Sequence, residues 1–181
     1  MRTTGLTYDD LLEMFPEETN RRVELIGGEL IVPPAASVRH QHVVARIAAQ
    51  LVPYGDTSGG LVMAGPDVHL TGRDVVQPDV CFLLPGNESR IEGGIVRGPV
   101  DLAVEISSPS TRRDDLGRKL DLYARHGVAE YWFVDLEAGR IEVRALQGSA
   151  YAEPETFARG ETLRSRALEG FTAPVDDLLG V

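Results

Sequence analysis

Hydrophobic and polar residues follow patterns that predict a mixed α/β domain. Two short stretches, residues 22–26 and 29–32, flank Gly27-Gly28, a residue pair typical of a tight β-hairpin. Pro33 and Pro34 end this hairpin, and apolar residues at helical spacing then predict a helix over residues 37–52. We therefore expect a hairpin followed by a long amphipathic helix.

The rest of the chain alternates between strand and helix patterns. Thr7 and Asp10 form a capping box for a short helix over residues 8–15. The residues between 85 and 98 are rich in glycine and predict a loop. Strands are predicted over 60–64, 67–70, 77–84, 100–107, 130–135 and 140–146, a helix over 113–126, and a last short strand and helix after 151, the helix near 175–179. This order predicts a central sheet surrounded by helices.

Composition is that of one globular domain, which we assign to residues 1–181. Apolar residues make up 43% of the chain and charged residues 25%. No apolar run is long enough to cross a bilayer, and the N-terminus lacks the basic and apolar regions of a signal peptide. We therefore expect a cytoplasmic protein that does not bind membranes. The single cysteine, Cys81, excludes an internal disulfide and a multi-cysteine metal site.

The charge of the chain limits its partners but is unevenly distributed. A net charge of −10 argues against tight, unaided binding to a polyanion such as nucleic acid. Residues 110–126 are an exception, because this segment contains five basic residues and three aspartates. Lys119, in this segment, is the only lysine among the 18 basic residues. Lysine and arginine differ in shape and in how readily they lose a proton, so Lys119 marks a position where that difference can matter.

Two acidic residues lie at the ends of predicted strands. Glu105 shares one face of the strand over 100–107 with Asp101, Ala103 and Ser107 and lies near the strand end, where α/β sheets place their sites. A solvated glutamate on an edge strand would give the same pattern. Asp79 follows Pro78 before an apolar run, and an ordinary turn residue is an equally simple interpretation.

The two acids are adjacent if their strands are antiparallel neighbours. Two carboxylates at short distance repel unless a cation lies between them. Oxygen ligands without cysteine or paired histidine favour Mg²⁺ or Mn²⁺ over zinc. Asp79 and Glu105 are therefore candidate ligands of a divalent metal.

Lys119 lies beside the predicted buried stripe of its helix. Leu116, Leu120 and Tyr123 recur at helical spacing, and Lys119 borders them. By itself this position suits a lysine that reaches solvent along the apolar surface or pairs with Asp115. Next to two converging acids, a functional lysine that stabilises charge on a reacting phosphate is the better account.

Three blocks of the sequence resemble one protein family. VQPDV, VEISSPST and RRDDLGRKLDLYARHGVAEYWFVD are similar to the Uma2 (DUF820) family of bacterial endonucleases, in the PD-(D/E)XK nuclease superfamily. RRVELIGGELIV and SVRHQHVVARIAAQL match its N-terminal hairpin and following helix. The resemblance implies a restriction-endonuclease-like fold, in which a central mixed sheet is flanked by helices and preceded by a β-hairpin.

The resemblance assigns roles by position. Pro78-Asp79 corresponds to the PD motif and Glu105 to the acid of the (D/E)XK strand, whereas Ser107 replaces the usual lysine and Lys119 supplies it from the next helix. Glu24 and the Ile106 carbonyl are expected to complete a Mg²⁺ site, with Mn²⁺ as a substitute. His40 matches a family histidine, for which we favour a structural or substrate-facing role over catalysis.

We therefore expect a metal-dependent endonuclease that acts on nucleic acid, with DNA as the favoured substrate. Arg112, Arg113 and Arg118 are candidate phosphate contacts, and the resemblance suggests a homodimer. The acidic composition and the displaced lysine also suit a non-catalytic binding or assembly module that keeps the fold. A serine or cysteine hydrolase is a more distant alternative, since the chain has no GxSxG motif.

Overall fold

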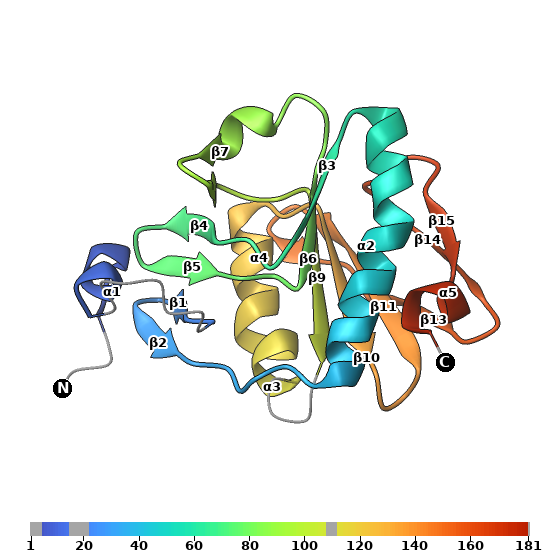
Figure 1. Ribbon diagram of the computed structural model, residues 1–181, viewed down its shortest axis with the longest axis horizontal. Coiled ribbons are helices and arrows are strands. Elements are labelled where there is room, and N and C mark those ends of the chain that lie inside the picture. Colours follow the sequence, from blue (N-terminus) through green and yellow to red (C-terminus); the bar gives the residue numbers. More distant parts are fainter. Residues whose placement is uncertain (1–4, 15–21, 108–111, 181) are drawn as a thin grey trace.

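A large sheet forms the centre of the protein (Figure 1). The computed structural model describes residues 5–14, 22–107 and 112–180 of the chain. In spatial order the strands are β12 (Ala150–Tyr151), β11 (Arg140–Gln147), β10 (Glu130–Asp135), β9 (Leu102–Ser107), β6 (Val80–Leu83) and β3 (Leu61–Ala64), and β13 (Glu155–Ala158) pairs with β11.

Strand β9 lies in the interior of this sheet. It pairs antiparallel with β6 and parallel with β10. A parallel pair needs a crossover connection, which the helical segment between these two strands provides. Because β9 has a neighbour on each side, Glu105 is not on an edge strand, and the interpretation of a solvated edge glutamate is wrong.

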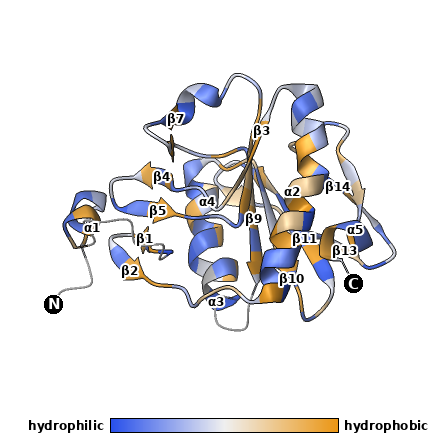
Figure 2. Cartoon of the chain, viewed as in Figure 1, coloured by the Kyte–Doolittle hydropathy of each residue, from blue (hydrophilic) through white to orange (hydrophobic). Residues whose placement is uncertain are grey.

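Helices cover both faces of the sheet. Helix α2 (Val38–Ser58) packs on one face and α4 (Leu120–His126) on the other. The strands between them are largely hydrophobic, as Figure 2 shows for β9 and β10. The two cores include Val43, Ile47, Val104 and Trp132 on the α2 face, and Ala103, Leu122, Tyr123 and Phe133 on the α4 face. A charged side chain on β9 is therefore enclosed by packed elements.

Helix α2 is longer than its sequence predicts. Ser37 is the N-cap, as expected, and its side chain accepts a hydrogen bond from the His40 N–H. The predicted end near residue 52 is wrong, since the helix continues through Pro53 to Ser58 and ends at Gly59, with φ at 82°. Leu51 and Gly55 are buried against the sheet. This packing outweighs the hydrogen bond that proline cannot make.

A second, smaller sheet begins with the predicted hairpin. Gly27 and Gly28 both have positive φ, which explains the need for glycine in this turn. Strand β5 (Asp74–Val76) is absent from the predicted strands, because its three residues are too few to show alternation. In spatial order the strands are β2 (Glu29–Ile31), β1 (Glu24–Ile26), β5 (Asp74–Val76), β4 (Val68–Thr71), β8 (Ile95–Arg97) and β7 (Ile91–Glu92).

The predicted loop over residues 85–98 contains regular structure. A short 3-10 helix, η1 (Glu88–Arg90), leads into strands β7 and β8, which form an antiparallel hairpin. Gly93 and Gly94 both have positive φ at its turn. The glycines that suggested a loop therefore form a second tight hairpin.

The predicted helix over residues 113–126 has three parts. It begins at Arg112 as α3 (Arg112–Asp114), widens into a π-helical turn, η2 (Asp115–Lys119), and continues as α4 to its C-cap, Gly127. A π turn inserts one extra residue and shifts the side chains that follow it around the helix axis. A helical wheel drawn for a regular α-helix therefore predicts the side-chain directions in α4 better than the direction of Lys119 in the π turn.

The first helix begins as predicted. Helix α1 (Tyr8–Met14) has the predicted capping box, in which the Asp10 N–H donates to Thr7 Oγ1 and the Thr7 N–H donates to Asp10 Oδ2. Phe15, its predicted last residue, lies outside the described residues.

The C-terminal helix α5 (Val175–Leu179) is confirmed. The segment before it contains more than the one predicted strand, because β14 (Thr162–Arg164) and β15 (Thr172–Pro174) form a pair in addition to β12 and β13.

The mixed α/β class, with helices on both faces of a central sheet and an N-terminal hairpin, is confirmed. The strands predicted over residues 22–26, 77–84 and 100–107 are shorter than expected, because β1 begins at Glu24, β6 at Val80 and β9 at Leu102. In the ranges that the structure describes, no helix is long and apolar enough to cross a bilayer.

Candidate active site

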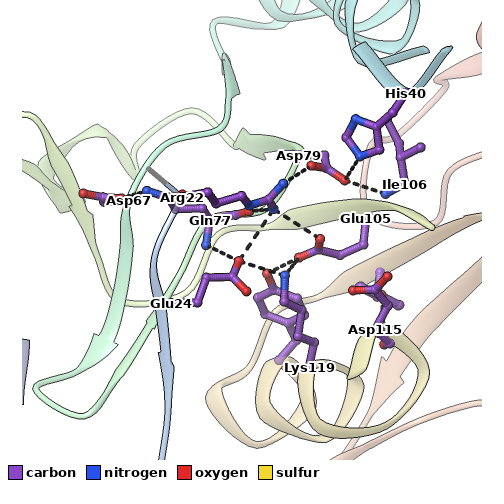
Figure 3. Close-up of polar contacts among 12 residues, drawn as sticks. Arg22, Glu24, His40, Asp67, Gln77, Asp79, Glu105, Ile106, Asp115 and Lys119 are labelled. Carbon is purple, nitrogen blue, oxygen red and sulfur yellow. Dashed lines mark hydrogen bonds and ion pairs between the residues drawn. The ribbon is translucent and has the colours of Figure 1, made fainter. Parts of the chain in front are cut away.

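A cavity of about 580 Å³ lies where β6 begins and β9 ends. The first hairpin, the start of α2, the two strands and the π turn all contribute to its wall. Charged side chains from these distant segments point toward one another in it (Figure 3). The charged and ionisable residues that line it are Arg22, Glu24, Arg39, His40, Asp79, Glu105, Asp115, Lys119 and Glu137.

Asp79 is buried directly before strand β6. Its Oδ2 atom accepts a hydrogen bond from the Ile106 N–H at 2.7 Å and lies 3.1 Å from His40 Nε2. Its Oδ1 atom accepts from Arg22 Nη1 at 2.5 Å. Burial alone would raise the pKa of Asp79, but the contacts with His40, Arg22 and the Ile106 N–H outweigh it and lower the pKa to about 2. Asp79 is therefore a carboxylate at neutral pH.

Glu105 lies one residue beyond the last β6–β9 pair, Val80 with Val104, which places it across from Asp79. Its side chain is 3% exposed. Its Oε1 atom accepts hydrogen bonds from Lys119 Nζ at 3.0 Å and from the Tyr123 hydroxyl at 2.8 Å. Burial raises the pKa of Glu105 and the Lys119 ammonium lowers it, while the charge on Asp79 raises it again, so the pKa stays above the usual range.

Lys119 is buried at the end of the π turn. Its Nζ atom donates to Glu24 Oε1 at 2.8 Å and to Glu105 Oε1 at 3.0 Å. Burial lowers the pKa of Lys119, but the two carboxylates raise it by more, so the ammonium stays charged. Asp115, at the start of the same turn, is also buried and lines the cavity. Lys119, which borders the predicted buried stripe of its helix, thus bridges β1 of the small sheet and β9 of the large sheet.

Glu24 comes from strand β1 of the small sheet. Its Oε1 atom accepts from Lys119 Nζ and from the Gln77 N–H at 3.0 Å. The side chain is 1% exposed. Glu24 therefore lies with Asp79, which precedes β6, and with Glu105 of β9, although Glu24 and Asp79 are far apart in the chain.

Arg22 lies at the centre of these acids and was not singled out from the sequence. Besides Asp79, it contacts Glu24 and Glu105, with Nη2 3.6 Å from Glu24 Oε1 and 3.6 Å from Glu105 Oε2. It also donates to the Gln77 carbonyl. The available signal was its spacing from Glu24, because residues two apart on an extended segment share one face.

His40 and Arg39 come from the first turn of α2. His40 is 8% exposed and contacts Asp79, so it is placed to orient that carboxylate. Arg39 is exposed and lines the cavity, and it was also missed from the sequence. Its position in the chain, next to His40, was the only local signal for it.

The three arginines that the sequence suggested for phosphate binding do not lie together. Arg112 donates to Asp135 Oδ2 at 2.7 Å and stacks over the Phe133 ring at 5.2 Å. Arg118 donates to Glu29 and the Ile26 carbonyl and lines a separate cavity of about 550 Å³. Arg113 is exposed. The main cavity is lined by Arg22 and Arg39 instead.

The three carboxylates are of the kind that binds a hard divalent cation, but they are arranged around the Arg22 guanidinium. Glu24, Asp79 and Glu105 converge on one cation, Arg22, and carboxylate oxygens are the ligands that Mg²⁺ prefers. Within residues 5–14, 22–107 and 112–180, no group of three or more histidine, cysteine or acidic side chains is arranged closely enough to hold a metal. The residues fit the metal chemically, and the carboxylates would have to close around it.

The mixed central sheet flanked by helices is a restriction-endonuclease-like nuclease fold. Residues 8–176 match the Uma2 family, which is described as "Putative restriction endonuclease". The chain therefore belongs to the Uma2 family, and family and fold together support a nuclease-type hydrolase.

A solved structure has the same fold. It is the crystal structure of a "putative nuclease belonging to DUF820" from Anabaena variabilis ATCC 29413, which superimposes with a TM-score of 0.79. The match covers 96% of this chain and 97% of the other at 18% sequence identity, so it shows the fold alone. A search of curated proteins found no match.

Proposed function

We propose that this protein is a divalent-metal-dependent endonuclease that hydrolyses phosphodiester bonds of nucleic acid, with DNA as the first candidate. One observation carries the proposal: Asp79, Glu105 and Lys119 meet with Glu24 in the wall of one cavity. Membership of a family of restriction-endonuclease type agrees with this chemistry.

The proposed metal ligands are Asp79, Glu105 and Glu24, with the Ile106 carbonyl as a fourth donor. Mg²⁺, or Mn²⁺ in its place, would act as a Lewis acid and lower the pKa of a bound water. The Ile106 N–H and His40 hold Asp79 Oδ2, and Oδ1 contacts the Arg22 guanidinium. The protein therefore orients one oxygen of Asp79 before any ligand binds.

Lys119 is proposed to stabilise charge rather than to bind the metal. Its ammonium touches Glu24 and Glu105 at once and reduces their mutual repulsion. As a fixed cation in the cavity wall, it can also stabilise the negative charge that builds on a reacting phosphate. The Tyr123 hydroxyl, bonded to the same oxygen of Glu105, keeps that side chain in place.

Phosphate contacts are proposed for Arg39, Arg112 and Arg113, and of these three Arg39 lines the cavity. Arg39 is exposed at its edge, and the ion-paired Arg112 and exposed Arg113 follow strand β9. Arg118 is the weakest candidate, because it lines a separate cavity and pairs with Glu29. The net charge of −10 limits binding over a wide surface, so we expect modest affinity that falls steeply with added salt.

The proposal is tested by incubating supercoiled plasmid and labelled DNA and RNA oligonucleotides with Mg²⁺, Mn²⁺ or EDTA. We expect cleavage that needs metal and falls by at least about 100-fold in Asp79→Asn, Glu105→Gln and Lys119→Met. Glu153→Gln, which changes an exposed acid, is the matched control. Metal-dependent cleavage that survives all three site variants would remove these residues from the mechanism.

A non-catalytic binding or assembly module is the second candidate. The observation that favours it is that Arg22 and Lys119 already neutralise the carboxylates without a metal. This candidate predicts no Mn²⁺-dependent rise in melting temperature and no cleavage of any nucleic acid.

A homodimer, which the family resemblance suggests, stays a prediction that light scattering after size-exclusion chromatography can test.

A further inference from the structure

Arg22 occupies the point on which the three acidic side chains converge. Nη1 is 2.5 Å from Asp79 Oδ1, and Nη2 is 3.6 Å from both Glu24 Oε1 and Glu105 Oε2 (Figure 3). Lys119 contacts the same two glutamates, but only through their Oε1 atoms. Asp79 Oδ1 and Glu105 Oε2 are thus compensated by the guanidinium alone among the side-chain contacts of the described residues.

The guanidinium is poorly fitted to this position. Only one of its contacts with the acids is a hydrogen bond, because 3.6 Å is too long for one. Its Nε atom is buried and has no hydrogen-bond partner among the described residues. A buried donor without a partner destabilises the conformation that buries it. Arg22 is therefore held near the two glutamates by charge alone, while its hydrogen bonds go to Asp79 and the Gln77 carbonyl.

Arg22 also has space into which its side chain can move. Its side chain is 28% exposed, in contrast to 4% for Asp79 and 3% for Glu105, and it lines the cavity. The residue precedes strand β1, so its backbone is outside the paired part of the hairpin. Rotation of the side chain would carry the guanidinium into the cavity without breaking strand pairing.

We propose that Arg22 is a displaceable counter-ion that competes with the divalent metal for Glu24, Asp79 and Glu105. This rests on the proposed function, in which those residues bind the metal. With Arg22 in place, the carboxylates stay apart and charge-neutralised. When the Arg22 side chain rotates into the cavity, its guanidinium is free to bind a phosphate of the substrate. Substrate phosphate and metal then favour the same rearrangement, so each binds more tightly in the presence of the other.

The first test is calorimetric titration of the full chain with Mn²⁺. We expect Arg22→Gln to bind Mn²⁺ at least about 10-fold more tightly than the wild type, because no guanidinium has to leave. Arg39→Gln is the matched control, since it removes one positive charge from the same cavity but makes no ion pair with these three acids in the described structure. We expect it to change the affinity by less than about 3-fold.

The outcomes separate this inference from the proposed function. If the wild type binds Mn²⁺ and Arg22→Gln binds it equally or more weakly, the competition is overturned while the metal site stands. If no variant binds Mn²⁺, the metal site and the competition both fall. If both arginine variants tighten binding alike, the effect is general electrostatics, and the specific role of Arg22 is overturned.

A second measurement does not depend on the stability of the variants. In the wild type, the side-chain N–H signal of the buried Arg22 Nε should shift, and exchange faster with solvent, when Mg²⁺ is added. A short abasic phosphodiester, which carries backbone phosphates but no bases, should increase the response at fixed Mg²⁺. An Arg22 signal that stays unchanged at saturating Mg²⁺ contradicts displacement.

Discussion

Lys119 Nζ lies 3.0 Å from Glu105 Oε1, although 14 residues separate the two in the chain. One residue ends a π turn and the other lies on an interior strand, and both side chains are almost fully buried. The same ammonium also binds Glu24 of the small sheet. This contact therefore ties together both sheets and the helical crossover at the proposed active site.

Replacing Lys119 with methionine should destabilise the fold by about 3 to 5 kcal/mol, because it removes the nearer of the two cations that contact the buried Glu24 and Glu105. Urea unfolding measures the change. A double-mutant cycle with Glu105→Gln supplies the control, since the pair interaction predicts that the double variant loses less stability than the sum of the single ones. Strictly additive losses would show that the contact contributes no coupling energy.

Glu130 should anchor the C-terminal segment to the sheet. Its buried carboxylate accepts hydrogen bonds from Trp132 Nε1, Ser165 Oγ and the N–H groups of Arg166 and Ala167. Glu130→Ala leaves these donors without a partner, and we expect a loss of about 2 to 4 kcal/mol.

Thermal and urea unfolding test the prediction for Glu130, and Glu153→Ala is the matched control on an exposed position. The control should change stability by less than about 0.5 kcal/mol. Faster hydrogen exchange in residues 162–179 should accompany the loss in Glu130→Ala. A variant as stable as the wild type would show that solvent replaces the carboxylate without cost.

Asp135 should contribute acid sensitivity. Burial raises its pKa, but the Ala138 N–H and the Arg112 guanidinium lower it by more, so the folded-state pKa is below the usual value. A carboxyl group of this kind stabilises the fold above its unfolded pKa of about 4, and the contribution disappears as the pH falls through the folded pKa.

The prediction for Asp135 is checked by the free energy of unfolding of Asp135→Asn and wild type between pH 7 and pH 2. The advantage of the wild type should be present at pH 7 and shrink below about pH 5. Asp56→Asn, on an exposed turn of α2, should follow the wild-type profile throughout. A difference between Asp135→Asn and wild type that stays constant with pH would contradict the linkage.

Local patterns were enough to predict much of the fold. Alternation identified the strands around Glu105 and Trp132, and the glycine pair at 27 and 28 identified the first hairpin. Capping residues identified the starts of α1 and α2. These features depend on neighbours within a few residues, so they can be read along the chain. The same reasoning fails for β5, β7 and β8, which are too short for alternation to appear.

The sequence by itself therefore determined the α/β class, most element positions and the Uma2 family. Only the tertiary structure decided that Glu105 is buried, since burial depends on which strands become neighbours of β9. It also decided that Arg22 lies among Glu24, Asp79 and Glu105, because three chain segments must pack together before one cation can reach all three. Long-range packing, which no local pattern encodes, thus turned separate charged residues into one site.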